Sequence, residues 1–162
     1  MRRTLVLSFL AIAAIVAILS ADQRQPARAL STSGCGVANV AGAFGFSYNG
    51  VAVTSTGTIP VGAVGKFHSD AAGNFTGDEI NSLAGTSAYQ TIVGKLTVNS
   101  ACSGELVANV YQNGQLVRTS YIHLQYQDND NQILGIFEKL VLPNGAQLPV
   151  VVTINGSRIS TN

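Results

Sequence analysis

Apolar and polar residues alternate in short runs from about residue 41 to the C-terminus, and Gly, Asn and Asp residues separate these runs. The clearest run, 88–99, has mainly apolar side chains at even-numbered positions and mainly polar ones at odd-numbered positions. A period of two residues is typical of a β-strand with one buried face. The pattern predicts strands at 42–48, 59–68, 74–83, 88–99, 104–111, 116–126, 132–142 and 148–154.

Short turn signals join these predicted strands. Asn113 and Gly114 stand between two apolar runs and predict a two-residue hairpin. Asn49 and Gly50 predict another turn. The segment 51–57 is then either a short strand or an ordered loop.

A long run of strands without a helix must protect its exposed edges, either by closing into a barrel or by stacking into a sandwich. Long strands joined by short hairpins favour an eight-stranded antiparallel up-and-down β-barrel, with a β-sandwich as the alternative. One local alternative concerns 132–142, where the apolar positions also fit a helical period. An all-β fold is expected in either case.

The first 29 residues have the pattern of a secretory signal peptide. Two arginines follow Met1, and residues 4–19 are almost wholly apolar. Ala27 and Ala29 form an A-x-A cleavage site, with Ser20-Ala21 as a nearer alternative. A retained transmembrane helix would need about 20 apolar residues, so we expect cleavage and no stable membrane anchor. Residues 30–40 are expected to be an extended lead-in and 41–162 a single barrel domain, secreted or periplasmic.

Removal of the leader changes the charge of the chain. The whole chain has a net charge of +1, but five basic and seven acidic residues follow position 29, which gives −2. These basic residues form no run or stripe, so nucleic acid is excluded as an expected partner. Cys35 and Cys102 are the two cysteines, and in an exported chain they are expected to form one disulfide.

Two motifs resemble a known family. The segment 64–77 reads as a strand, a D-x-x-G-N turn and a second strand, and the segment 94–99 is followed by Cys102, Ser103 and Gly104. Together they resemble small exported bacterial proteins of the calycin-like, allene-oxide-cyclase-barrel-like group. The resemblance implies an eight-stranded barrel with an apolar interior site, and it carries over no catalytic residue. The chain contains no Trp, so the G-x-W signature of lipocalins is absent.

The candidate ligand-binding residues come from strand positions that can face inward. The strand 116–126 has polar residues on both faces. Its polar groups either enter an enclosed cavity or face water on an edge-like strand, and the second arrangement is the more common. The candidates are Phe67, Ile92, Arg118 and Tyr126.

The candidates for acid–base chemistry are Glu79 and His123. An inward-facing Glu79 would be a buried carboxylate and a candidate general acid or base. In the more common arrangement, Asp78 and Glu79 flank a bulge at Gly77 and one of them is exposed. No spacing of His, Cys and carboxylates matches a metal motif, and no cofactor is indicated.

The sequence favours an exported barrel that binds a small apolar molecule in its lumen, and it leans away from an enzyme. One alternative is a cyclase or isomerase that uses the same lumen. The other is an inhibitor or adhesion module that acts through surface loops. The identity of the ligand and the oligomeric state are left open.

Overall fold

The computed structural model describes residues 34–159. The predicted signal peptide at 1–29 and the first residues of the predicted lead-in lie outside the described residues. Within the described part, no helix is long and apolar enough to cross a membrane. The helical turn α2, Val37–Val40, differs from the extended lead-in expected there.

The rest of the described chain consists of strands joined by short turns. Their bounds are β1 Gly42–Thr54, β2 Gly57–Ser69, β3 Asn74–Leu83, β4 Thr86–Val98, β5 Ser103–Gln112, β6 Gln115–Gln127, β7 Gln132–Val141, β8 Gln147–Leu148 and β9 Val150–Arg158.

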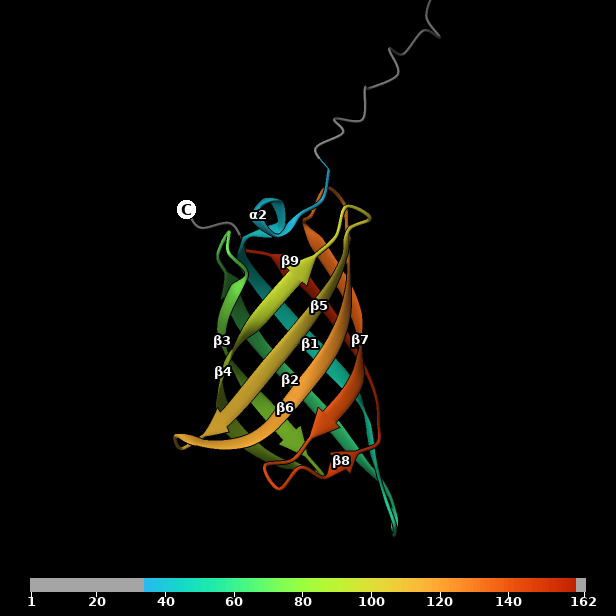
Figure 1. Cartoon of the computed structure of the whole chain (residues 1–162). Coiled ribbons are helices and arrows are strands. Elements are labelled where there is room, and N and C mark those ends of the chain that lie inside the picture. The colour runs from blue at the N-terminus through green and yellow to red at the C-terminus, as the bar shows by residue number, and fades with distance from the viewer. Residues whose placement is uncertain (1–33, 160–162) are drawn as a thin grey trace, which may run out of the picture. The chain divides into compact units, whose positions relative to one another are not determined.

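The sheet closes on itself. Each strand from β1 to β7 pairs antiparallel with the next. Strand β9 pairs antiparallel with both β7 and β1, which joins the last strands to the first (Figure 1). The two-residue strand β8 only adds to the end of β7. The predicted eight-stranded antiparallel up-and-down barrel is therefore confirmed, and the sandwich alternative is wrong.

Aromatic side chains fill the end of the barrel next to α2. Phe67 stacks between two other rings, with centroid distances of 5.2 Å to Phe44 and 4.5 Å to Phe75. Tyr126 meets the ring of Phe44 edge-on at 6.2 Å. Val40 of α2 has no exposed surface and packs onto this cluster. Burying each such side chain stabilises the fold by about 1.5–3 kcal/mol, so this end is a packed core.

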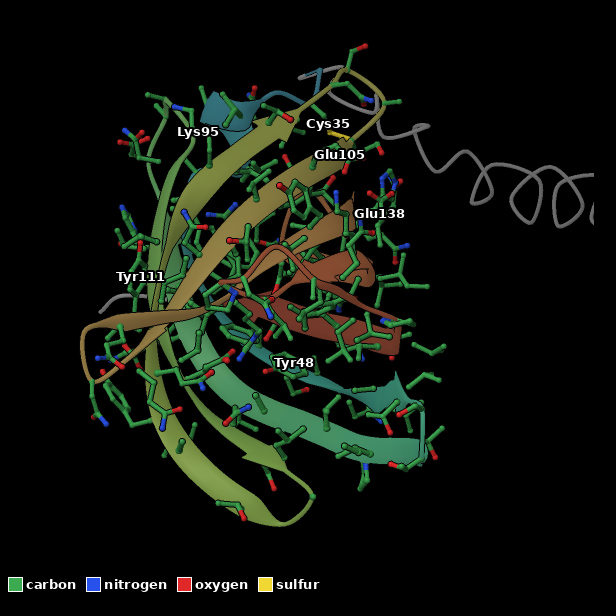
Figure 2. The ribbon with its side chains drawn as sticks, turned by 60° about the horizontal axis from the view of Figure 1, so that its bottom comes forward. Cys35, Tyr48, Lys95, Glu105, Tyr111 and Glu138 are labelled. Carbon is green, nitrogen blue, oxygen red and sulfur yellow. A yellow bond between two sulfur atoms is a disulfide. The ribbon has the colours of Figure 1, made fainter. Side chains whose placement is uncertain are left out.

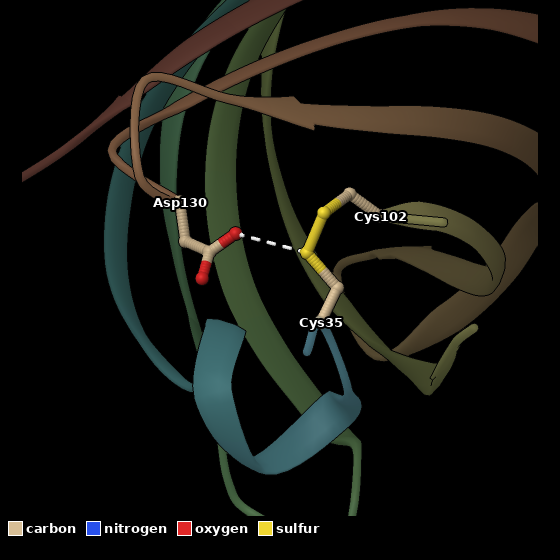
Figure 3. A group of neighbouring side chains, drawn as sticks. All are labelled: Cys35, Cys102 and Asp130. Carbon is tan, nitrogen blue, oxygen red and sulfur yellow. Dashed lines mark hydrogen bonds between the residues drawn. A yellow bond between two sulfur atoms is a disulfide. The ribbon is translucent and has the colours of Figure 1, made fainter. Parts of the chain in front are cut away.

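The predicted disulfide between Cys35 and Cys102 is confirmed, with the two Cα atoms 5.0 Å apart. It links the segment before α2 to the turn between β4 and β5. Oδ1 of Asp130 lies 3.5 Å from Sγ of Cys35 (Figure 3). A disulfide of this kind indicates an oxidising environment.

The turn predicted at Asn49 and Gly50 is wrong, because both residues lie inside the continuous strand β1. A Cβ at Gly50 would overlap the backbone of Val151 on β9. The glycine therefore serves the close approach of two strands, and the chain reverses later, at residues 55–56.

Strand pairing decides two further expectations. Residues 132–141 form strand β7, as predicted, and the helical alternative is wrong, since β6 and β9 pair with this segment on either side. Strand β6 is not edge-like, because β5 and β7 both pair with it. Its alternate side chains are consequently enclosed by the barrel.

The bulge expected at Gly77 is also wrong. Strand β3 keeps an unbroken register with β2 and with β4 through this residue. A Cβ on Gly77 would come within 3.0 Å of the Cβ of Phe67. The missing side chain lets Phe67 pack against the wall, and the regular register turns Glu79 into the lumen.

Candidate functional site

A cavity of about 500 Å³ occupies the end of the barrel away from α2. Thirteen of its nineteen lining residues are apolar. They come from the hairpin β1–β2, the hairpin β3–β4, Val117 of β6, and the segment from β7 to β9. Ile59, Leu140 and Val150 are examples. The lumen is therefore packed at one end and open at the other.

Five polar side chains from five different strands meet at the floor of this cavity. An ion pair joins Arg118 of β6 to Glu79 of β3, with 2.5 Å between Nη2 and Oε1. Tyr48 of β1 completes a triangle, because its hydroxyl donates to Glu79 at 3.1 Å and accepts from Nη2 of Arg118 at 3.0 Å. Figure 2 shows Tyr48 within the ring of strands.

Two amides extend this group toward the cavity. Nη1 of Arg118 donates to Oε1 of Gln90 at 2.7 Å. Nε2 of Gln90 in turn donates to Oε1 of Gln112 at 3.0 Å. The five side chains thus form one hydrogen-bonded chain, with the carboxylate at one end and Gln112 at the other.

Burial stabilises the neutral form of the tyrosine in this group. Burial raises the pKa of Tyr48 far above its usual range, and the neighbouring Glu79 raises it further, while Arg118 partly opposes the shift. A tyrosine is protonated at neutral pH in any case, and the raised pKa keeps this hydroxyl a donor to Glu79 in alkaline solution as well.

The guanidinium borders both the large cavity and a small inner void, whereas the carboxylate borders only the inner void. Glu79 has only 1% of its side chain exposed and borders a small inner void of about 30 Å³ among aromatic and aliphatic residues. Arg118, Gln90 and Gln112 border the large cavity, and Glu79 does not. The floor of the cavity consequently presents N–H groups, with the carboxylate behind them.

The structure brings two of the candidate residues together and places the others apart from the large cavity. Arg118 and Glu79 come together in the lumen, although they were proposed for different roles. Phe67 and Ile92 line the inner void and not the large cavity. Tyr126 lies in the packed end, where burial raises its pKa and its hydroxyl has no partner among the described residues.

Sequence reasoning missed three members of the floor, namely Tyr48, Gln90 and Gln112. Gln90 carries a usable signal, since it is the one polar residue at the even-numbered positions from 88 to 98. Gln112 gives no such signal, because it precedes a turn where polar residues are common.

His123 lies on the outer wall of the barrel, apart from the cavity. Its Nδ1 is 2.5 Å from Oε1 of Glu105 and 3.9 Å from Oε1 of Glu138, and its Nε2 is 3.0 Å from Oγ of Ser103. A register shift between β6 and β7 leaves Glu138 without a partner residue on β6. The group could ligate a divalent cation through one nitrogen and two carboxylates, but all three side chains are more than a third exposed.

Comparison with known proteins adds little to this geometry. No family model and no curated protein matches the chain. One solved structure, an S-type phycobiliprotein lyase from Guillardia theta, aligns with a TM-score of 0.42 and 5% identity over 78% of this chain and 92% of that one. Such a likeness does not bear on what this chain binds. The closed eight-stranded barrel agrees with the calycin-like architecture, and the finer resemblance to allene-oxide-cyclase barrels stays a prediction.

Proposed function

We propose that this protein is an exported, disulfide-linked barrel that binds one small, mainly apolar molecule in the cavity at the open end of its lumen. The cavity carries the proposal. Its volume of about 500 Å³ lies in the range of small-molecule sites, and such sites combine apolar walls with a few convergent polar groups. The walls and the floor described above have this composition.

Export is part of the proposal. The apolar leader at 4–19 and the A-x-A pattern of Ala27 and Ala29 fit a cleaved signal peptide. The link between Cys35 and Cys102 fits the oxidising compartments that such a leader would reach. We therefore expect the mature protein to be secreted or periplasmic.

The two alternatives have less support. A lumen enzyme of the cyclase or isomerase kind would need a titratable group at the ligand, and Glu79 stands behind Arg118, away from the cavity. A module acting only through its surface loops would not need a cavity of this size in its lumen.

A pair of neighbouring substitutions tests the proposal. Ala52 is buried and lines the cavity, whereas the next residue, Val53, is exposed. Titration with Nile red, an uncharged apolar dye, should give saturable fluorescence enhancement with the wild-type protein. Ala52→Phe should weaken binding about tenfold or more, since overlap in a filled site costs about 1–3 kcal/mol. Val53→Phe is the matched control and should bind as the wild type does.

Two results would contradict the proposal. One is the absence of saturable dye binding by the folded wild-type protein. The other is equal binding by Ala52→Phe and the wild type, with circular dichroism showing that both are folded.

A further inference from the structure

The direction of the hydrogen bonds at the cavity floor follows from the chemistry of Arg118. A guanidinium has five N–H donors and no acceptor, so the amide oxygen of Gln90 must face it. The amide nitrogen of Gln90 then faces Gln112, which must offer its own oxygen. Both amide oxygens are thereby engaged within the floor.

This arrangement leaves N–H donors for a ligand. Arg118 makes three hydrogen bonds to described residues, to Gln90, Tyr48 and Glu79, and so two of its five N–H groups have no partner among them. Nε2 of Gln112 also makes no hydrogen bond to a described residue, and 11% of the Arg118 side chain is exposed. The floor therefore offers an excess of N–H donors to a hydrogen-bond acceptor, whereas Asn81 and Thr86 elsewhere on the cavity lining can both donate and accept.

The charges of the lumen decide which kind of acceptor fits. Arg118 and Glu79 are the two charged residues among those lining the cavity and the inner void, and their charges cancel. An anionic head group would bring a second negative charge close to Glu79 with no unpaired cation to balance it. A cationic head group would face N–H donors, which repel a positive charge and cannot accept a hydrogen bond from it. Burying an uncompensated charge is far more costly than burying a neutral acceptor that receives a hydrogen bond.

We infer that the ligand is an uncharged, mainly apolar molecule with a carbonyl-type acceptor, such as a ketone, aldehyde or ester, at one end. Its oxygen accepts N–H groups of Arg118 and Gln112, and its apolar part lies along the wall that includes Ile59, Leu140 and Val150. This inference rests on the proposed function and specifies the ligand class of the same cavity.

Three probes with the same number of carbon atoms test it: methyl nonyl ketone, undecanoate and undecylammonium. Each is titrated at neutral pH into the full protein loaded with Nile red, and displacement is followed by fluorescence. The ketone should displace the dye at concentrations about tenfold lower than either charged probe, the factor expected when a buried hydrogen bond replaces a buried unpaired charge.

A charge variant then tests the electrostatic reasoning. Glu79→Gln keeps the shape of the side chain and leaves the positive charge of Arg118 uncompensated. The affinity for undecanoate, relative to that for the ketone, should therefore rise about tenfold. Glu105→Gln removes the same charge on the outer wall and should leave the ratio of the two affinities unchanged. The ratio is measured within one protein, so an overall loss of binding does not obscure it.

The possible outcomes separate this inference from the proposed function. If Nile red and all three probes fail to bind, the proposed function itself is wrong. If undecanoate or undecylammonium binds the wild-type protein as well as the ketone does, the cavity binds ligands but the ligand class inferred here is wrong. The wild-type comparison decides this point even if Glu79→Gln does not fold.

Discussion

The buried ion pair gives the sharpest prediction about stability. Arg118→Met removes the guanidinium while keeping a long apolar side chain. Glu79, with 1% of its side chain exposed, would then be a buried charge without a cationic partner. Gln90 and Tyr48 would each lose a hydrogen bond as well.

The expected loss is a large part of the stability of such a domain. Removing one partner of a buried pair costs about 3–5 kcal/mol, and a domain of this size is stable by about 5–15 kcal/mol in all. The double variant Glu79→Gln/Arg118→Met leaves no buried charge. Its free energy of unfolding should return to within about 2 kcal/mol of the wild type, because uncharged replacements of a buried pair are often close to neutral.

Urea unfolding followed by circular dichroism, with the disulfide intact, measures these free energies. Glu105→Gln on the outer wall serves as the control and should change stability by about 1 kcal/mol or less, as exposed pairs do. The reasoning is refuted if Arg118→Met stays within about 1 kcal/mol of the wild type. It is also refuted if the double variant is no more stable than Arg118→Met.

Three further predictions concern the frame of the barrel. Replacing Cys35 and Cys102 by Ser together should lower the free energy of unfolding by about 4 kcal/mol, the chain-entropy value for a sequence separation of 67 residues; an unchanged urea midpoint would contradict this. Hydrogen bonds, above all from the Asn74 side chain, hold the pKa of Asp70 below its usual range, so this carboxylate stabilises the fold above about pH 4 and the stabilisation is lost as the pH falls through the folded pKa. Asp70→Ala should therefore lower the urea midpoint at neutral pH but differ little from the wild type in strong acid. Gly50→Ala should destabilise the barrel, because its Cβ overlaps the backbone of β9, and a thermal melt equal to that of the wild type would show that the strands can separate at no cost.

Much of the barrel could be predicted from the sequence because its information is local. Alternation with a period of two is a property of one strand, and the turn at Asn113 and Gly114 needs only two residues that accept positive φ, at 53° and 78°. The disulfide followed from the number of cysteines.

The features that were missed depend on strands that are distant in sequence. Gly50 has the appearance of a turn residue, but the partner that requires its missing side chain is about a hundred positions away on β9. Arg118 and Glu79 are separated by 39 residues and meet across the lumen, where no pairing rule links them. Arg118 and Ser120 of β6 could be read as inward-facing only once the barrel was known to close.

Native mass spectrometry tests the central claim, ligand binding in the open cavity, most directly. The wild-type protein, isolated without detergent or organic solvent, should carry a non-covalent small molecule. The same added mass should be found on Val53→Phe and should be lost from Ala52→Phe, whose new ring occupies the cavity. A bare chain in the wild type, or an identical adduct on folded Ala52→Phe, would contradict the account.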